Sequence, residues 1–561
     1  MLRLTELSLP LDHSSDALRA AIVKRLKIND ADLLGFTVFK RSYDARKKNS
    51  TILFVYVIDA KLRNEAAVLK RFADDRNVMP APDTNYHFVV EPGSVQADER
   101  PIVVGFGPCG LFAALLLAQM GLRPIVLERG QDVRQRTKDT WALWRQRKLS
   151  PESNVQFGEG GAGLFSDGKL YSQIKDPKFY GRKVMQEFVR AGAPPEILYV
   201  SKPHIGTFRL TGVVAAMRDE IIALGGEVRF GSRVKDLLLE DMHDDAVTGP
   251  AGTEPKQIVG VVLDSGEQIT SRHVVLALGH SSRDTFRMLH RQGVFVEAKP
   301  FAIGFRIEHP QSQIDRARLG KYAGHPELGA ADYKLTYQAS NGRAVYSFCM
   351  CPGGTVVAAT SEEGRVVTNG MSQYSRNERN ANAGIVVGID PARDFPGGPL
   401  AGVELQERLE AAAYALGGSN YNAPGQLVGD FLRGTPSSTF GEVVPSYKPG
   451  VTLTDLAPSL PEYAISAIRE ALPAFGKQLH GFDRADAVLT GIETRTSSPL
   501  RITRDAVTLQ SLNVKGLYPA GEGAGYAGGI LSAGVDGIRV AEAVAADMLD
   551  LVEKHPVSAA R

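Results

Sequence analysis

The residues best suited to chemistry include two cysteines, Cys349 and Cys351, within the segment FCMCPGG. On an extended strand alternate side chains project from one face, so the two thiols could form a redox pair. A disulfide across a single intervening residue is strained, however, so a structural or substrate-lining role is the favoured interpretation. The third cysteine, Cys109, lies in a glycine-rich loop where a small side chain suits helix packing, and redox chemistry is not expected of it.

Proton transfer and anion binding have their own candidates. His280 follows Gly279 at the end of an apolar run, and a histidine there could donate a proton to a bound ligand. Arg306 lies on a segment that could face the same cavity and bind an anionic group. His204 and His309 are further candidates, although an exposed or structural histidine explains each equally well. Metal-ligand, serine-nucleophile and Walker A spacings are absent, so no metal site is expected.

The elements that would position these groups begin with the segment PIVVGFGPCGLFAALLLAQMGLRPIVLERG, residues 101–130. It predicts a buried strand at 102–104, a helix that starts at Pro108, and a second strand at 124–127. The amino-terminal N–H groups and the dipole of such a helix would face bound phosphates. The order and spacing of these parts predict a dinucleotide-binding βαβ unit.

Each of several residues in this unit has its own expected role in binding a dinucleotide. Gly105 permits the tight turn, Gly107 lets the backbone approach a pyrophosphate, and Gly110 lets the helix pack against the strand. Glu128 ends the second strand 23 residues after Gly105. Its carboxylate could accept both hydroxyl hydrogen bonds of an adenosine ribose and repel a 2′-phosphate. The same site is expected to include Pro108, Cys109 and Arg129.

Two further glycine-rich segments are expected to complete the site. The segment GLYPAGEGAGYAGGI (516–530) predicts a strand, a loop and a helix start, whose dipole would stabilise negative charge on a bound ring. The segment QFGEGGAGLFSDGKLY (156–171) concentrates glycines, which allow a backbone to follow a ligand closely. The site residues expected here are Gly160, Gly161, Ala162, Gly163, Ser166, Gly521, Glu522, Gly528, Gly529 and Ile530.

These motifs resemble those of the glutathione reductase-like superfamily of FAD-binding proteins. The closing segment is similar to its carboxy-terminal flavin motif, with Glu522 where aspartate is usual, and QITSRHVVLALGHSS resembles its strand-and-turn motif that returns to the cofactor at Gly279. The whole chain is most similar to a bacterial family of FAD-dependent dehydrogenases of unassigned substrate, through SYDARKK, FGEGGAGLFSDGKL, ALGHSSRDTF, FCMCPGG, ETRTSSP and YPAGEGAGYAGGI. The resemblance implies FAD as the cofactor, and Arg495 in ETRTSSP could hold flavin or substrate.

The resemblance and the element pattern predict an α/β fold in three parts. A small amino-terminal α/β sandwich is followed by a linker and a Rossmann-like FAD-binding domain, which is split in the sequence. A mixed α/β substrate domain is inserted between the halves and is expected to cover the flavin. The predicted ranges are 1–75 for the amino-terminal domain, 76–96 for the linker, 97–290 and 481–555 for the FAD-binding halves, 291–480 for the insertion and 556–561 for a tail.

The expected activity is hydride transfer between a small-molecule substrate and flavin N5. Disulfide reductases of the superfamily carry a dedicated NAD(P)H domain, and no second complete dinucleotide fingerprint occurs here. A disulfide reductase is therefore not expected, and any NAD(P)H would bind transiently as an electron donor. Two alternatives stay open: an RNA-modifying enzyme that docks through a basic loop at 40–48, and a non-catalytic flavin-based redox sensor or adaptor.

The composition of the chain narrows the classes of partner and cellular location that are expected. Lys plus Arg (65) nearly balance Asp plus Glu (63), so the bulk charge does not require nucleic acid or a membrane surface. The loop at 40–48 is basic but has no aromatic platform, so a solvated hairpin is its favoured interpretation. Three cysteines, an amino terminus unlike a signal peptide and no apolar run of membrane length predict a cytoplasmic protein without a membrane partner.

Overall fold

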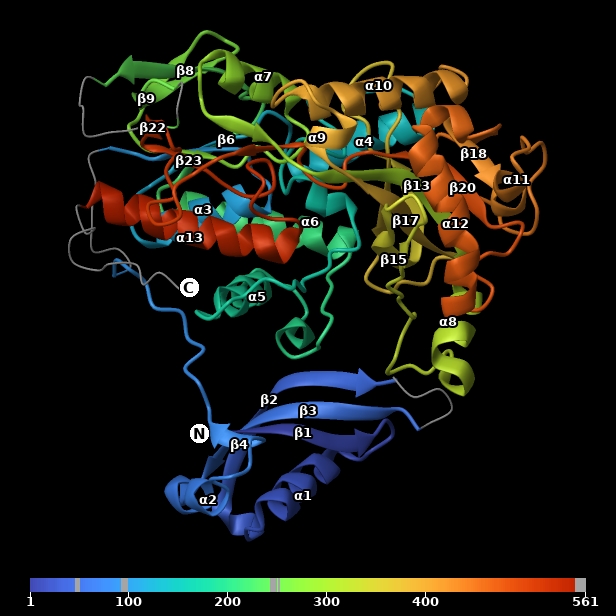
Figure 1. Ribbon diagram of the computed structural model, residues 1–561. Helices are drawn as coiled ribbons and strands as arrows, with labels where there is room; N and C mark the ends of the chain where they lie inside the picture. Colours follow the sequence, from blue (N-terminus) through green and yellow to red (C-terminus); the bar gives the residue numbers. More distant parts are fainter. Residues whose placement is uncertain (46–50, 92–98, 243–249, 251–252, 550–561) are drawn as a thin grey trace.

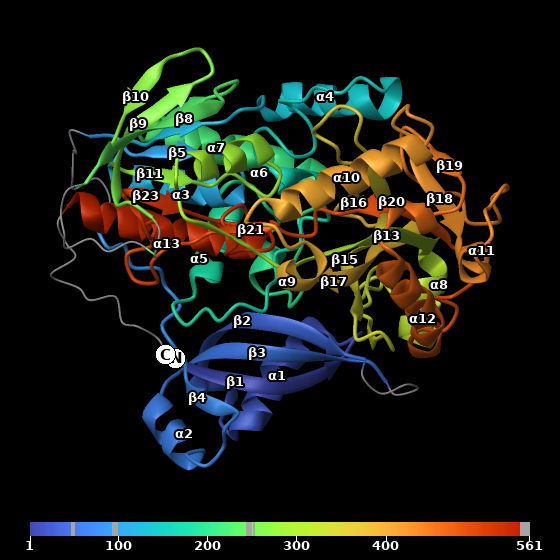
Figure 2. The same cartoon turned by 45° about the horizontal axis from the view of Figure 1, so that its top comes forward.

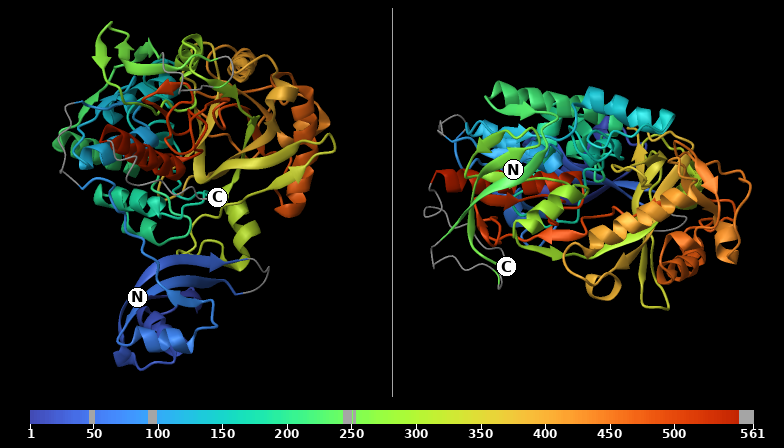
Figure 3. Two further views of the ribbon diagram at one scale, coloured as in Figure 1. Left: turned by 60° about the vertical axis from the view of Figure 1, so that its left-hand side comes forward. Right: turned by 90° about the horizontal axis from the view of Figure 1, so that it is seen from above.

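The computed structural model describes residues 1–45, 51–91, 99–242, 250 and 253–549. Figure 1 shows a small amino-terminal domain, in blue, set beside a larger body. Within the body a half built on a parallel sheet lies next to a half built on an antiparallel sheet, and the view from above in Figure 3 agrees. Among the described residues no helix has both the length and the apolar character needed to cross a bilayer.

The amino-terminal domain has the order βαββαβ and a sheet of order β2-β3-β1-β4, which is the ferredoxin-like arrangement. β4 pairs antiparallel with β1, so the sheet extends to Pro80, past the expected boundary at residue 75. A proline is tolerated there because β4 is an edge strand. The elements are β1 (Leu2–Pro10), α1 (Ser15–Leu26), β2 (Leu33–Asp44), β3 (Leu53–Leu62), α2 (Glu65–Arg71) and β4 (Val78–Pro80).

One face of this sheet is apolar and packs on its own helices, where Leu18, Ile22 and Leu26 of α1 are buried. The body lies on the other side of the sheet, as Figure 1 and the left view of Figure 3 show. There the Arg182 guanidinium of α5 (Tyr180–Arg190) lies 5.1 Å from the ring centre of Phe39. The edge strand β2 also bonds to the body through the backbone of Arg41.

The first half of the body is a five-stranded parallel sheet of order β23-β11-β5-β6-β7. α3 and α13 pack against each other so closely that a Cβ on Gly537 would lie 2.3 Å from the Cys109 carbonyl oxygen. The elements are β5 (Ile102–Val104), α3 (Pro108–Gln119), β6 (Ile125–Leu127), α4 (Val133–Gln146), α5, α6 (Thr207–Ala223), β7 (Glu227–Arg229), β11 (Val274–Leu276), α7 (Arg283–Arg291), β23 (Leu517–Pro519) and α13 (Ile530–Met548).

A second, smaller sheet lies at the outer edge of this half, where Figure 2 shows β8, β9 and β10 together. Its strands are β8 (Val234–Asp241), β9 (Lys256–Leu263), β10 (Gln268–Thr270) and β22 (Val514–Lys515). β22 comes from the end of the chain and pairs parallel with β9. A two-stranded antiparallel ladder, β12 (Val296–Ala298) with β21 (Leu500–Ile502), links the start of the inserted segment to its end.

The second half is a largely antiparallel sheet of order β14-β15-β17-β13-β20-β18-β19, with β16 paired to β15. β20 pairs with β13 and β18, so the inserted sheet continues to Glu493, beyond the expected boundary at residue 480. The elements are β13 (Phe301–Pro310), α8 (Gln311–Leu319), β14 (Thr336–Gln338), β15 (Ala344–Ala358), β16 (Thr368–Ser372), β17 (Asn380–Ile389), α9 (Pro391–Asp394), α10 (Ala401–Leu416), β18 (Ala423–Leu427), α11 (Val428–Arg433), β19 (Val451–Leu453), α12 (Glu462–Gln478) and β20 (Val488–Glu493).

Candidate functional site

A cavity of about 370 Å³ lies at the carboxyl ends of β5, β6, β11 and β23. In open parallel sheets ligands bind at this edge, where the connections leave in opposite directions from neighbouring strands. Its opposite wall, called the roof below, consists of Phe348, Cys349, Asn369 and Glu493 from the antiparallel sheet. The cavity therefore lies between the two halves of the body, as expected for a site assembled from distant parts of the chain.

The cavity collects predicted residues from every glycine-rich segment. Those that line it are Gly105, Gly107, Pro108, Cys109, Glu128, Arg129, Gly161, Ala162, Gly163, Ser166, Gly279, His280, Cys349, Arg495, Glu522, Gly528, Gly529 and Ile530. Five others do not line it, namely Gly110, Gly160, Gly521, Arg306 and Cys351. His309 is fully buried elsewhere against the Phe482 carbonyl oxygen, and His204 stacks on Tyr374.

The glycines of the site fall into two groups. At Gly110 an added Cβ would lie 2.0 Å from the Gly105 carbonyl oxygen, and at Gly521 it would lie 2.8 Å from Cys109 Cβ. Packing alone therefore demands these two glycines. At Gly107 the nearest atom would be 3.5 Å away, and at Gly528 no atom lies within 4 Å. Neither has a positive φ, so the protein itself leaves room for a side chain at both positions.

Glu128 is more heavily committed to the protein than its motif suggested. Its Oε2 atom accepts from the Phe106 N–H at 2.8 Å, and Oε1 accepts from the N–H groups of Gly130 and Gly158 at 2.8 and 2.9 Å. A carboxylate offers about four acceptor positions, so about one stays open for a ribose hydroxyl. Arg129 beside it is paired with Glu152 and Asp284, at 2.9 and 2.8 Å.

Sequence reasoning missed Arg136, which holds the glycine-rich segment in shape. Its fully buried guanidinium donates to the carbonyl oxygens of Asn154, Val155, Gly158 and Glu159 at 2.7–3.2 Å. Burial lowers the pKa of Arg136 to about 10, and the charge is retained at neutral pH. No local motif marks this arginine, because its four acceptors come from a loop about 20 residues further along the chain.

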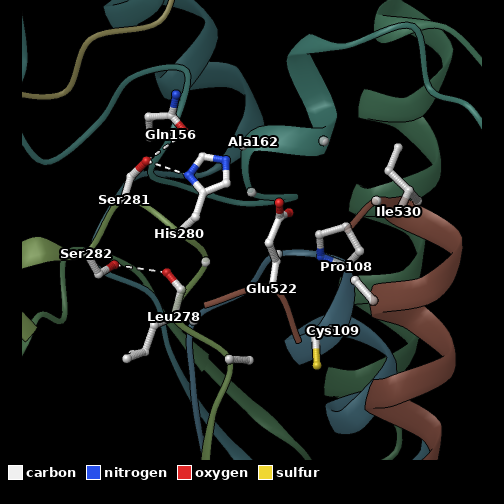
Figure 4. Close-up of a pocket in the computed structure, with 18 of the residues that line it drawn as sticks. Pro108, Cys109, Gln156, Ala162, Leu278, His280, Ser281, Ser282, Glu522 and Ile530 are labelled. Atoms are coloured by element: carbon white, nitrogen blue, oxygen red, sulfur yellow. Dashed lines mark hydrogen bonds between the residues drawn. The ribbon is translucent and has the colours of Figure 1, made fainter. Parts of the chain in front are cut away.

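His280 lies on the cavity wall in a short chain of hydrogen bonds, drawn in Figure 4. Ser281 Oγ donates to Gln156 Oε1 at 3.1 Å and lies 2.8 Å from His280 Nδ1. The serine proton is committed to Gln156, so we assign the imidazole proton to Nδ1, which leaves Nε2 as an acceptor. Burial, with the charges of Arg495 and Arg283, lowers the pKa of His280 to about 3. His280 is thus neutral across the physiological range.

A buried cluster of charged side chains packs against this wall of the cavity. Glu410 of α10 is fully buried and is bonded by Arg283 at 2.6 Å and by Arg495 at 2.8 Å. Arg495 also donates to Ser361 Oγ at 2.7 Å. Burial alone would raise the pKa of the Glu410 carboxyl, but the two guanidinium groups hold it well below its usual range. Glu410 and Arg283 carried no sequence signal, because the cluster joins α7, α10 and the strand end after β20.

Glu522 projects into the cavity beside His280, as Figure 4 shows. Among the described residues, no side chain or backbone group forms a hydrogen bond with the Glu522 carboxyl. Burial raises the pKa of the Glu522 carboxyl to about 7, against a smaller opposing effect of Lys299. A carboxyl with this pKa can hold or release a proton near neutral pH.

The raised pKa of Glu522 has a measurable consequence. Because the folded protein binds this proton more tightly than the unfolded chain, Glu522 favours folding at low pH, and its contribution disappears as pH rises through about 7. For flavin-free protein we expect a loss on the order of 2 kcal/mol between pH 5 and pH 8. Thermal unfolding across this range should show the slope in wild type and lose it in Glu522→Gln. An unchanged slope in the variant would contradict the assignment.

The roof departs from the regular strand that the cysteine spacing suggested. The pairing of β15 with β17 shifts register between Phe348 and Cys351, and Cys349 has a φ of +42°. Cys349 therefore reaches the cavity, whereas Cys351 is fully buried behind it. Arg306 is also fully buried, and it pairs with Glu493 at 2.9 Å rather than facing the cavity.

Two other predicted features, the basic loop at 40–48 and the tail, lie partly or wholly outside the described residues. Of the basic loop, Arg46, Lys47 and Lys48 lie outside the described residues, and Arg41 pairs with Glu327 at 3.2 Å. The predicted tail at 556–561 is also outside them. Within the described ranges no group of three or more histidine, cysteine or acidic side chains could hold a metal ion.

A parallel sheet with glycine turns after β5 and β23, and with a helix starting at each turn, defines a Rossmann-like mixed α/β protein. A family model described as "FAD-dependent protein, C-terminal domain-like" matches residues 300–496, and domain of unknown function DUF8436 matches residues 1–61. An uncharacterized protein of Clostridium beijerinckii is 47% identical over 548 residues, which cover 96% of this chain and 98% of that protein. The chain belongs to the same family as this clostridial protein, and it carries a domain of the FAD-dependent class.

Two solved structures with oxidase or reductase-like descriptions are distantly similar to this chain. A geranylgeranyl bacteriochlorophyll reductase-like protein from Thermoplasma acidophilum is 13% identical, with 81% of this chain and 82% of that chain covered and a TM-score of 0.36. Glycine oxidase from Bacillus cereus is 12% identical, with 80% and 96% covered and a TM-score of 0.30. The expected FAD-dependent family is confirmed at the level of the family model, and membership of the glutathione reductase-like superfamily stays a prediction.

Proposed function

We propose that this protein is an FAD-dependent oxidoreductase that exchanges hydride between a small-molecule substrate and flavin N5. The observation that carries the proposal is the pair Gly107 and Gly528. Both line the cavity, both lack a steric reason within the protein to be glycine, and they lie about 420 residues apart in the sequence. A ligand that approaches the backbone at both places explains why neither carries a side chain.

The residues present fit an extended dinucleotide. The start of α3 after Gly107 would hold the pyrophosphate with its free N–H groups, and Glu128 would hold the adenosine ribose with its remaining acceptor position. The start of α13 at Ile530, together with Gly528, would hold the pyrimidine side of the flavin, where positive potential favours the reduced ring. These assignments place the flavin ring below the roof.

Bound FAD would supply hydride exchange at N5, and the chain would supply orientation and protons. His280 Nε2 is an acceptor and can orient a substrate hydroxyl or amine. Glu522 can take up or release the proton that accompanies a hydride, because its pKa is about 7. The roof closes the cavity from the other side and would limit the access of water to the reacting atoms.

The proposal is tested by anaerobic titration of the purified protein with NADH and NADPH while the flavin spectrum is followed. We expect bound flavin that is released as FAD on denaturation and that bleaches with one of the two nucleotides. Bleaching would establish a reductase half-reaction, whereas bleaching only by a substrate would make the substrate the hydride donor. A purified protein without flavin that fails to bind added FAD would overturn the proposal.

The alternatives make different predictions in the same experiments. Flavin that neither nucleotide reduces, with no turnover of any substrate, would favour a redox sensor or adaptor. Nucleic acid that remains after high-salt purification would favour an RNA-modifying enzyme. The ferredoxin-like domain gives this last alternative limited support, because RNA-recognition domains of this topology stack bases on an open sheet face. Here that face carries the Arg3–Asp59 ion pair and is turned toward α5.

A further inference from the structure

The roof contains a cluster of reactive groups that hydride transfer does not use. Cys349 lines the cavity and Cys351 is buried directly behind it, both as free thiols. The two lie in the irregular part of β15, where Cys349 is held in the left-handed region at φ +42°. A non-glycine residue kept in this region carries a conformational cost, and such strain is concentrated at functional sites.

The irregular backbone places the Cys351 thiol against the backbone of Cys349. In a regular strand alternate Cα atoms lie about 6.6 Å apart, near the upper limit for a disulfide. At the left-handed residue 349 the strand is irregular, and the Cys351 thiol donates to the Cys349 carbonyl oxygen at 3.4 Å.

Two cations bond to consecutive backbone carbonyl groups at Cys349 and Met350. Arg306 of β13 donates to the Cys349 carbonyl oxygen at 2.9 Å, and the Lys169 ammonium donates to the next carbonyl oxygen, that of Met350. The charged groups that face the thiols are Lys169 and Asp167 from the glycine-rich segment, Arg306 from β13, Glu493 from β20 and Glu522 from the loop after β23. Glu493 neutralises Arg306 at 2.9 Å, whereas Lys169 lies 3.7 Å from Asp167, and Asp167 is paired more closely with Arg376 at 2.5 Å. Lys169 is therefore the less fully neutralised of the two cations beside the thiols.

The pKa values of the two thiols move in opposite directions. The neighbouring Cys351 thiol lowers the pKa of the Cys349 thiol, burial opposes it, and the charges of Lys169 and Arg306 reinforce the lowering. The neighbouring Cys349 sulfur, together with burial, raises the pKa of the Cys351 thiol. The accessible sulfur is therefore the nucleophilic one and the buried sulfur is the protonated one, as an attacking and resolving pair requires.

We propose that Cys349 and Cys351 form a redox pair that accepts a small-molecule disulfide as its substrate. The Cys349 thiolate attacks one sulfur of the disulfide, that S–S bond breaks, and one thiolate leaves. Cys351 loses its proton and attacks the Cys349 sulfur, the second thiolate leaves and takes up this proton, and a Cys349–Cys351 disulfide forms. The small disulfide gains two electrons and the pair loses two. The step that reopens the pair rests on the proposed function, since reduced flavin in the same cavity would return the electrons.

Thiol trapping tests the pair directly. The holoprotein is equilibrated in glutathione buffers from reducing to oxidising, quenched with acid and alkylated, and the tryptic peptide 344–365 is analysed by mass spectrometry. We expect an intramolecular disulfide in wild type, glutathione trapped on Cys349 in Cys351→Ser, and neither product in Cys349→Ser. Cys109, which is buried with a raised thiol pKa, is the internal control and should stay reduced. A wild-type peptide that stays reduced, or that carries glutathione without the intramolecular disulfide, would overturn the proposal.

A second measurement tests the positioning role of Lys169. At pH 6 we expect iodoacetamide to alkylate Cys349 at least tenfold more slowly in Lys169→Met than in wild type, with the rate profile moved to higher pH and Lys169→Arg restoring it. Equal rates would remove Lys169 from the site. Flavin absorbance recorded on the same samples separates the two proposals. Disulfide formation in protein that binds no flavin would overturn only the proposed function, and bound, reducible flavin without the disulfide would overturn only this inference.

Discussion

Valine in place of Gly107 is expected to give a folded but colourless protein. The residue has a φ of −74°, which any L-amino acid adopts, and its added Cβ would have no neighbour closer than 3.5 Å. The fold should therefore accept the substitution, whereas the valine methyl groups would occupy the space of the pyrophosphate. We expect FAD affinity to fall about a hundredfold or more, equivalent to about 3 kcal/mol. Visible absorbance and fluorescence titration with FAD measure the loss.

A matched variant separates this effect from a general cost of losing glycine. Gly212 lies on α6, is exposed, and has no atom within 4 Å of an added Cβ, but it does not line the cavity. Gly212→Val should keep its flavin and its yellow colour. Full colour in Gly107→Val would show that the cavity at the start of α3 does not hold a pyrophosphate, and the cofactor assignment would fail with it.

Glu410→Gln is expected to cause a large loss of stability, of about 3–5 kcal/mol. The carboxylate accepts from Arg283 and Arg495 and from the Thr494 hydroxyl, and all of these groups are buried. A neutral amide would leave the buried Arg495 guanidinium without its carboxylate partner, and Arg283 would keep only Glu362, at 2.9 Å. Because Glu410 belongs to α10 and Arg283 to α7, the loss should weaken the contact between the two halves of the body. Urea denaturation followed by fluorescence and by flavin release measures both effects.

The Glu410 carboxyl also makes the stability of the folded protein depend on pH, in a direction that its lowered pKa determines. The folded protein holds the pKa of Glu410 below the unfolded value of about 4.5, so its contribution is present above that pH and is lost as pH falls further. Wild type should lose stability below pH 4.5 more steeply than Glu410→Gln. Glu407→Gln is the control on the same helix, since its partly exposed pair with Arg287 should contribute less than about 1 kcal/mol. Equal losses in the two variants would contradict this account.

The dinucleotide unit could be predicted because its evidence is local. A turn glycine, a helix-starting proline and a strand-ending acid are fixed by backbone geometry over about 25 residues, and α3 does begin at Pro108. The strand, loop and helix start predicted for the segment 516–530 are also local, and α13 begins at Ile530. The positions of these glycines relative to one ligand are not local, however, and only the assembled cavity shows which of them have open space before them.

The features that could not be predicted from the sequence depend on contacts between distant segments. Arg136 and Glu410 have no local mark, because their partners come from other elements. The predicted boundary at residue 480 assigns β20 to the second FAD-binding half, but its partners β13 and β18 place it in the inserted sheet. The alternation expected at Cys349 and Cys351 assumed a regular strand, and pairing with β17 introduces a register shift that no spacing rule reveals.

The backbone bonds of Arg41 protect an otherwise vulnerable edge of the amino-terminal sheet. β2 has a strand partner on one side only, β3, and unpaired strand edges are the places where chains aggregate. On the free side Arg41 donates to the Tyr199 carbonyl oxygen at 2.6 Å and accepts from the Ser201 N–H at 2.9 Å. A short piece of the body thus lies along β2 near its carboxyl end as a partial fifth strand. The amino-terminal domain has a core of its own, but it relies on the rest of the chain to keep its edge from pairing with another copy.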